Sequence, residues 1–330
     1  MVNFDSQWAF QRPGLLLQNG QVSIGWASYC DAGPYHGWVI AYDASTLNQI
    51  GAFNDSPNGQ QGGIWMSGGG LAGDANFNTY FATGNGTFDG VTAFGDSIVQ
   101  LGPPGSGSLP MLDWFTPFDQ NDMNINDYDL GSGGVLLLPD LPAGSAHQHL
   151  LVEAGKEGTI YLVDRDNMGH YCSTCTSGDP QIVQELRTVF GQLFATPAYW
   201  NGNLYFAASA DPVEAFSFNA GGSGLISVSQ TSFAPTDIAE PGSNLSISAN
   251  GNTGGIVWAV DNSSFPNACC QVLHAYDASN LASELYNSSQ APNNRDVSGG
   301  GLHFNLPTIA NGKVYVGTQN QLVVYGLLPQ

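Results

Sequence analysis

The cysteines of this chain are the side chains with the most obvious potential for redox or metal chemistry. Cys172 and Cys175 stand in the loop-like stretch HYCSTC, with the spacing of half a zinc site. A structural zinc site needs four ligands, and no second CxxC pair occurs in the chain. We therefore expect Cys172 and Cys175 to form a local disulfide, which implies an oxidising compartment.

The six histidines offer less specific metal chemistry. His147 and His149 are separated by one residue, so on a strand they would share a face and could bind a metal with a third ligand. The spacing identifies no third ligand, which favours a surface turn. His36 and His303 fall near predicted strand entries, where they could line a channel. A hydrolase or lyase that uses these histidines is a weaker hypothesis, because the sequence has no nucleophile elbow, phosphate loop or zinc-protease motif.

The charge balance excludes whole classes of partner. Six Lys and Arg stand against 27 Asp and Glu, which gives a formal net charge of −21. Such a surface repels nucleic acid and anionic membranes, because binding to phosphates depends on basic side chains. No apolar run reaches the length of about 18 residues that a membrane span needs. The composition is typical of a secreted, extracellular or periplasmic protein. Since the sequence shows no signal peptide, we expect it to be the mature form of such a protein.

Four of the sequons in the chain are compatible with glycosylation of surface loops. They begin at Asn85, Asn244, Asn262 and Asn287.

The elements that must position these residues are hairpins, and they recur along the chain. Each hairpin consists of a Pro, a short run of residues, an Asn-Gly turn and a strand of alternating apolar residues. Three copies read RPGLLLQNGQVSIG, TPAYWNGNLYFAAS and LPTIANGKVYVGTQ. Asn-Gly between apolar alternations is a strong hairpin signal, since both central residues of a type I′ turn need a positive φ. The segment AYDAS is also repeated, at residues 41–45 and 275–279. Repeated hairpins predict a β-propeller.

Each repeat contains one recognisable strand that is followed by a turn, and six copies of this strand occur. They predict a single domain over residues 1–330 that has about six four-stranded blades. Seven or eight blades are the alternatives. The last repeat stops early, so we expect the N-terminal strand to complete the final blade and close the ring. Helix is expected only as one short segment around residues 181–193. The six marked segments are residues 37–45, 96–105, 158–169, 213–222, 272–279 and 321–327.

The stretch AGKEGTIYLVDRDNMG, with DWFTPFDQNDMNINDYDLGSGGVLLLPD before it and ANGKVYVGTQ after it, resembles a known family. These segments look like the repeats of pyrroloquinoline quinone (PQQ)-like, quinoprotein dehydrogenase-like β-propeller proteins. The resemblance covers nearly all of the chain as a fold and is specific over residues 114–169. Many propellers of this kind bind no quinone, so the resemblance predicts the fold more strongly than the function.

The resemblance implies PQQ and Ca²⁺ as cofactors of an enzyme that oxidises alcohols or sugars. In such enzymes a Trp stacks on one face of PQQ and often a vicinal disulfide on the other. An Asp serves as general base, and a Lys or Arg polarises a quinone carbonyl. The resemblance places Asp127 and Asp129 as the catalytic carboxylates, of which one is the general base, and as Ca²⁺ ligands. The His-Asp step of the family falls on Met123-Asn124 here, and the alternative for the acidic stretch is ordinary turn chemistry.

Four further residues take a cofactor-binding role from the resemblance. Lys156 and Arg165 are the cations of the matched segment, and Cys269-Cys270 would be the vicinal disulfide, although it comes late in the chain. Each has a structural alternative. Lys156 and Arg165 could serve the fold alone, with Arg165 bridging blades through Asp164 or Asp166. Cys269 could pair with Cys30, or the Cys269-Cys270 pair could simply stiffen a loop.

Two functions of different classes follow. The sequence favours a secreted, non-catalytic propeller that binds a glycan, a small molecule or other copies of itself, because the His-Asp step is absent and cations for the trianionic PQQ are few. The alternative is a PQQ- and Ca²⁺-dependent alcohol or sugar dehydrogenase, in which Asp127 or Asp129 takes the hydroxyl proton.

Overall fold

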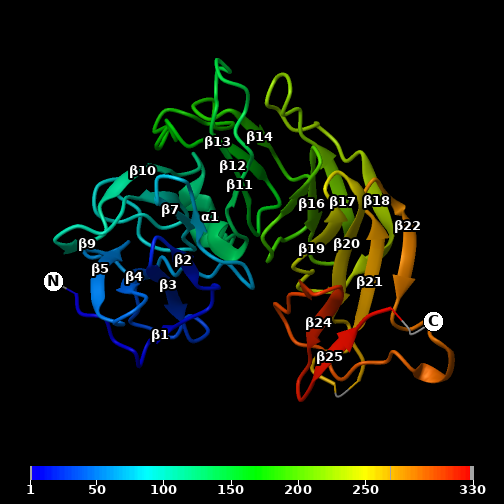
Figure 1. Ribbon diagram of the computed structural model, residues 1–330. Coiled ribbons are helices and arrows are strands. Elements are labelled where there is room, and N and C mark those ends of the chain that lie inside the picture. Colours follow the sequence, from blue (N-terminus) through cyan, green and yellow to red (C-terminus); the bar gives the residue numbers. More distant parts are fainter. Residues whose placement is uncertain (1, 268, 328–330) are drawn as a thin grey trace. The chain divides into compact units, whose positions relative to one another are not determined.

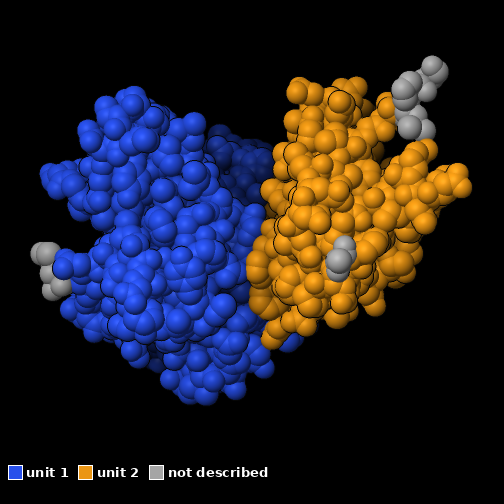
Figure 2. All heavy atoms as spheres, turned by 90° about the horizontal axis from the view of Figure 1, so that it is seen from below, with its two compact units in different colours: residues 1–188 blue, residues 189–330 orange. Residues whose placement is uncertain are grey.

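The computed structural model describes residues 2–267 and 269–327, and these residues form β-sheets with little helix. The chain divides into two compact units, residues 1–188 (unit 1) and residues 189–330 (unit 2) (Figure 2). The single domain expected over residues 1–330 stays a prediction. No helix of the described residues is long and apolar enough to cross a membrane.

Unit 1 contains three sheets, which follow one another along the chain except that β9 returns to the first sheet (Figure 1). The first sheet holds β1 (Ala9–Phe10), β2 (Leu16–Gln18), β3 (Gln21–Ser28), β4 (Trp38–Asp43), β5 (Gln49–Asn54) and β9 (Gly107–Ser108). The second holds β6 (Ala72–Gly73), β7 (Thr79–Ala82), β8 (Ile98–Leu101) and β10 (Met111–Phe115). The third holds β11 (Leu136–Leu137), β12 (Leu150–Ala154), β13 (Ile160–Asp164) and β14 (Gln184–Leu186).

Unit 2 repeats the same antiparallel pattern three times (Figure 1). Its first sheet holds β15 (Ala198–Trp200), β16 (Asn203–Ala207), β17 (Asp211–Ser217) and β18 (Ser232–Ile238). Its second holds β19 (Ser246–Asn250), β20 (Thr253–Asp261), β21 (Val272–Asp277) and β22 (Asn280–Asn287). Its third has only β23 (Thr308–Ala310), β24 (Lys313–Gly317) and β25 (Leu322–Tyr325) among the described residues.

The repeats predicted from the sequence correspond to these sheets. The six marked segments supply β4, β8, β13, β17, β21 and β25, one to each sheet. The Asn-Gly turns have the positive φ angles of a type I′ turn: 47° and 72° at Asn19-Gly20, and 51° and 69° at Asn311-Gly312. The hairpin prediction is confirmed. How many blades a closed ring would contain stays a prediction.

The role expected for the N-terminal strand is wrong. β1 pairs with β3 of the first sheet, through Ala9 opposite Ser28 and Phe10 opposite Ala27. The physical reason is the length of β3, whose first half is paired by the short strand β2, with Gln18 opposite Gln21. The second half of β3 offers free backbone groups on the same side, and β1 satisfies them.

The expected helix is also misplaced. Residues 181–193 contain β14 instead, and the one α-helix of the described residues is α1 (Gln120–Asn126). α1 has an acidic residue, Asp122, in its first turn and ends at Asp127, which has the left-handed φ of 60°. An acidic first turn suits the positive N-terminal end of the helix dipole. Two short 3₁₀ turns cover Leu130–Ser132 and Pro292–Asn294.

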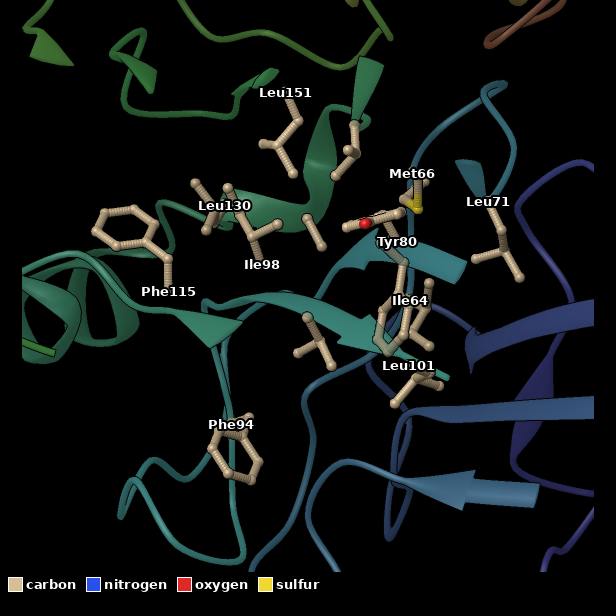
Figure 3. Packing of buried hydrophobic residues seen from close by; sticks show 14 of the residues in the cluster. Ile64, Met66, Leu71, Tyr80, Phe94, Ile98, Leu101, Phe115, Leu130 and Leu151 are labelled. Carbon is tan, nitrogen blue, oxygen red and sulfur yellow. The ribbon is translucent and has the colours of Figure 1, made fainter. Parts of the chain in front are cut away.

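The core of unit 1 places the loops on which the candidate site lies. Leu130, which follows α1, is fully buried among strand residues such as Ile98 and Leu151 (Figure 3). Ile64 and Met66, from the connection between β5 and β6, are buried in the same cluster. Because protein interiors are close-packed, the burial of Leu130 and Met66 holds the backbone on either side of these residues in place.

Candidate functional site

Lys156 lies between the two carboxylates that the resemblance singled out. Its ammonium donates to Asp127 Oδ2 at 2.9 Å and to Asp129 Oδ2 at 2.5 Å. The backbone N–H of Lys156 also donates to the carbonyl of Asp129 at 3.1 Å. Lys156 stands in the turn between β12 and β13, whereas both aspartates follow α1. The structure thus brings together three of the predicted site residues from two separate loops.

A third loop completes this cluster through Asn85, a residue that the sequence analysis treated only as a sequon. The N–H of Asn85 donates to Asp129 Oδ1 at 2.8 Å, and its side-chain amide donates to Asp127 Oδ1 at 2.9 Å. The amide oxygen Oδ1 of Asn85 is buried and has no hydrogen-bond partner among the described residues. A buried acceptor without a partner is costly, which makes this oxygen a candidate contact for a bound group. We call Asn85, Asp127, Asp129 and Lys156 the acid–lysine cluster.

Burial separates the roles of the two carboxylates. The Asp129 residue is 8% exposed, whereas the Asp127 side chain is 74% exposed. Burial raises the pKa of Asp129, against the opposing effects of Lys156 and of the Asn85 N–H. Burial lowers the pKa of Lys156, but attraction and hydrogen bonds from Asp129 and Asp127 outweigh it, so its pKa is raised. Lys156 therefore stays protonated at neutral pH.

An aromatic ring and a second cation lie beside the cluster. A Cβ added at Gly84 would contact both Asp129 Oδ1 and the ring of Trp65, so only glycine leaves room there. Trp65 is 9% exposed, and its Nε1 is buried without a hydrogen-bond partner among the described residues. The guanidinium carbon of Arg12 lies 5.4 Å from the centroid of the Trp65 ring. These distances are those of a cation–π contact.

Arg165 belongs to a different set of contacts. Its NH2 donates to Asp140 Oδ1 at 3.2 Å, its Nε donates to the Leu150 carbonyl at 3.3 Å, and its NH1 lies 3.9 Å from Asp74 Oδ2. Asp74 follows β6, whereas Arg165 follows β13, so the arginine links two sheets of unit 1. A bridging role is therefore supported, although its acidic partners are Asp74 and Asp140 rather than the expected Asp164 or Asp166.

Four of the five cysteines form disulfides. Cys172 and Cys175 form the expected local disulfide. Cys269 and Cys270 form a vicinal disulfide in unit 2, and Cys30 is free and exposed. The alternative pairing of Cys269 with Cys30 is therefore wrong.

The histidine pair does not share a metal. His147 Nδ1 lies 2.7 Å from Asp164 Oδ2, and His149 Nδ1 lies 2.7 Å from Asp166 Oδ2. Each imidazole thus has its own carboxylate partner. Within residues 2–267 and 269–327, no group of three or more His, Cys, Asp or Glu side chains has the arrangement of a metal site.

Most of the sequons are unsuited to a glycan. Asn244 and Asn262 are 3% and 2% exposed. The side-chain amide of Asn85 is bound to Asp127, and that of Asn287 donates to Glu284 at 3.0 Å. Since a glycan is bulky and must project into solvent, the expectation of glycosylated surface loops is wrong for the two buried positions.

Asn85 and Trp65 are the residues of this site that sequence reasoning missed. Asn85 stands in ATGNG, directly after β7, where Gly-Asn-Gly is indistinguishable from an ordinary turn. Trp65 stands in GGIWMSGGG, in an irregular connection without periodicity. The glycines on both sides were the available signal, because they permit close approach of the backbone.

Comparisons with known proteins identify the fold. No family model matches the chain, and no curated protein is similar to it in sequence. Among solved structures, it is similar to quinohemoprotein alcohol dehydrogenase ADHIIG from Pseudomonas putida HK5, with TM-score 0.53 and 14% identity over 95% of this chain and 56% of that one. It is equally similar to quinohemoprotein alcohol dehydrogenase from Comamonas testosteroni, with TM-score 0.53 and 14% identity over 92% and 55%.

BamB from Moraxella catarrhalis is also matched, with TM-score 0.45 and 12% identity over 95% of this chain and 84% of that one. The chain spans a little over half the length of the two alcohol dehydrogenases. At these identities the likeness is one of fold. The chain has the PQQ-like β-propeller fold that the sequence predicted.

Proposed function

We propose that unit 1 binds PQQ together with a divalent cation at the acid–lysine cluster, and that the protein is a secreted or periplasmic quinoprotein-type oxidoreductase acting on alcohols or sugars. The observation that carries the proposal is the buried, unpartnered Oδ1 of Asn85 beside Asp127 and Asp129. Carboxylate and amide oxygens are the ligands that a hard cation such as Ca²⁺ prefers.

The cluster contains donor groups for both ligands, and a cation would have to share the carboxylates with Lys156, which bonds to both of them. Asp127, Asp129 and Asn85 supply oxygen ligands for the cation. Lys156 and Arg12 supply positive charge for an anionic cofactor, and the buried ring of Trp65, which Arg12 approaches to 5.4 Å, lies beside them. Bound PQQ would supply a two-electron acceptor for hydride from the substrate carbon.

The chain's own residues divide the remaining work by their exposure. Asp127, whose side chain is 74% exposed, would accept the hydroxyl proton of a substrate that arrives from solvent. Asp129, held by Lys156 and by the Asn85 N–H, is placed to fix the ammonium. Asp129 and Trp65 both pack against the backbone of Gly84, where any side chain would overlap them.

The second candidate is a non-catalytic binding or assembly propeller. One observation favours it: Lys156 already bonds to both carboxylates, so the acid–lysine cluster is largely neutralised without a ligand. The missing His-Asp step at Met123-Asn124 points the same way.

A titration with PQQ separates the two candidates. Purified protein is mixed with micromolar PQQ and Ca²⁺, and tryptophan fluorescence, quinone absorption and dye reduction with alcohols and sugars are recorded. We expect saturable quenching and a substrate-dependent rate in the wild type, with at least tenfold weaker binding in Lys156→Met, because a charge-assisted contact is lost.

The matched control is Lys313→Met, which removes the only other lysine and changes the net charge equally. Binding that is equal in both variants would place PQQ elsewhere. No binding at micromolar PQQ would exclude the quinoprotein function and leave the non-catalytic propeller.

A further inference from the structure

A small polar cavity of about 220 Å³ lies between the second and third sheets of unit 1. Gln100 and Tyr80 reach it from β8 and β7 of the second sheet, and Arg165 reaches it from the end of β13 in the third. We call it the Arg165 cavity, and its lining also includes Asp74, Asp140 and Asp166. The acid–lysine cluster lies elsewhere, since Lys156 precedes β13 whereas Arg165 follows it.

The buried amide of Gln100 has an acceptor to spare. Gln100 is 8% exposed, and its Nε2 donates to the Tyr80 hydroxyl at 2.8 Å. That hydroxyl donates in turn to Asp74 Oδ2 at 2.9 Å, so towards Gln100 it can only accept. Burial raises the pKa of Tyr80 to about 12, which keeps the hydroxyl protonated. These bonds fix the amide orientation and leave Gln100 Oε1 without a hydrogen bond among residues 2–267 and 269–327.

The guanidinium of Arg165 offers a donor to the same cavity. The Arg165 side chain is 7% exposed. Its Nε donates to the Leu150 carbonyl and its Nη2 to Asp140 Oδ1. Its Nη1 carries two N–H groups and lies 3.9 Å from Asp74 Oδ2, which is beyond hydrogen-bond distance. At least one N–H of Nη1 is therefore available to a ligand. Buried polar groups without partners are costly, so the cavity favours a molecule that pairs with both side chains.

The chemistry of these two groups selects a hydroxyl. One hydroxyl can donate to Gln100 Oε1 while it accepts from Arg165 Nη1. A carboxylate or phosphate oxygen cannot donate, and a metal cation would meet the positive guanidinium. The rim adds two further acceptors, because the side chains of Asp140 and Asp166 are 62% and 61% exposed. Together with Asp74 they repel anionic ligands.

We propose that the Arg165 cavity binds a neutral polyhydroxylated ring of the size of one monosaccharide. One ring hydroxyl bonds to Gln100 Oε1 and Arg165 Nη1 at the buried end, and neighbouring hydroxyls donate to the carboxylates of Asp140 and Asp166 at the rim. The volume of about 220 Å³ is below the roughly 300–1,000 Å³ of pockets for drug-sized molecules, so it holds one ring. The proposal uses no residue of the acid–lysine cluster and is independent of the proposed cofactor site.

Saturation-transfer difference NMR with D-glucose, D-galactose and D-mannose tests the proposal on the wild-type protein. We expect at least one of these sugars to bind with a dissociation constant of about 1–10 mM, the affinity of a ring of about 12 non-hydrogen atoms at ordinary ligand efficiency. The corresponding uronate should bind at least tenfold more weakly, because it brings a negative charge to three carboxylates. No saturable signal for any of the three sugars, or equal affinity for the uronate, would overturn the proposal.

A pair of glutamine variants places the sugar in the cavity. Gln100→Leu should weaken binding at least tenfold, because the buried acceptor is lost. The matched control is Gln21→Leu on β3, since Gln21 is also 8% exposed and its Nε2 also donates one bond, to Ser23 Oγ at 2.8 Å. Gln21→Leu should bind as the wild type does. Equal affinity in the two variants would contradict the assignment.

A second pair of variants changes only exposed carboxylates and so does not depend on how well Gln100→Leu folds. Asp140→Asn at the rim should weaken binding at least threefold, because a charge-assisted hydrogen bond becomes a neutral one. Its control is Asp237→Asn, at an exposed position of β18 in unit 2. If both variants bind as tightly as the wild type, the sugar does not use the rim and the proposal fails.

Two further titrations identify the source of the ligand and exclude a cation site. Methyl glycosides of the bound sugar mimic the end residue of a glycan, so their binding identifies a glycan as the source, and binding of the free sugar alone identifies a monosaccharide. Micromolar Ca²⁺ should leave the affinity for the sugar unchanged. Displacement of the sugar by Ca²⁺ would show that the carboxylates form a metal site and would overturn the proposal.

Discussion

Replacing Lys156 by methionine should destabilise the protein by about 3 kcal/mol at pH 8. Removing one partner of a buried ion pair costs about 3–5 kcal/mol, because the other charge stays buried without compensation. The low end applies here, since the Lys156 side chain is 14% exposed and Asp129 keeps the Asn85 N–H at 2.8 Å. Urea unfolding followed by tryptophan fluorescence measures the free energy of unfolding.

The pH dependence of this loss identifies its cause. Burial raises the pKa of Asp129, and removing Lys156 raises it further in the folded state. A carboxyl whose pKa is higher in the folded state loses stability as pH rises from its unfolded value, about 4, to its folded value. The deficit of Lys156→Met should therefore be smaller at pH 5 than at pH 8.

Two comparisons would refute this reasoning. Lys156→Met combined with Asp129→Asn should recover at least half of the loss, since the uncompensated charge is gone. Lys313→Met, at an exposed position of β24, should change the free energy of unfolding by less than about 0.5 kcal/mol. A cost for Lys156→Met as small as that of Lys313→Met would show that the acid–lysine cluster is not an ion pair of consequence.

Three other outcomes are expected. Gly84→Ala should lower the free energy of unfolding by about 1–3 kcal/mol, because its Cβ would overlap Asp129 and Trp65, whereas Gly105→Ala has no atom within 4 Å of the new Cβ and should cost under about 1 kcal/mol. Burial raises the pKa of Asp179 to about 7, so stability should fall between about pH 4 and pH 7, and Asp179→Asn should flatten this slope in urea titrations. Replacing both cysteines of the Cys172–Cys175 disulfide by serine should cost about 2 kcal/mol at most by calorimetry, because the loop that it closes is short.

The hairpin repeat was predictable because its signals are local. An Asn-Gly pair needs two positive φ angles, and the turn residues Asn19-Gly20 and Asn311-Gly312 have them. The alternating strand that follows the second of these turns places apolar side chains on a buried face, since Val314 and Val316 of β24 are buried. Such features depend on neighbours along the chain, which is why the sequence predicted one marked strand for each sheet.

Long-range pairing was less predictable. β1 is only two residues long, and its partner is decided by the half of β3 that β2 leaves unpaired. Neither residue type nor spacing in the sequence indicates which half of β3 lacks a partner strand. Likewise, residues 181–193 contain β14 rather than a helix, because Tyr161 and Glu185 pair across the adjacent strands β13 and β14.

The site was predictable in part for the same reason. Asp127, Asp129 and Lys156 belong to the stretch that resembles the quinoprotein dehydrogenases, and they do lie together. Asn85 and Trp65 come from earlier loops whose turn-like sequences gave no sign of a shared site. Their proximity to Asp129 arises from the packing of separate loops, which only the folded chain reveals.

The most direct test of the proposed function is calorimetric titration of the protein with PQQ in the presence and absence of Ca²⁺. We predict one site with micromolar or tighter affinity that requires Ca²⁺, is lost in Asp129→Asn and is unchanged in Lys313→Met. Absence of heat with Ca²⁺ present, or binding that Asp129→Asn leaves intact, would contradict the assignment of the acid–lysine cluster as a quinone and cation site.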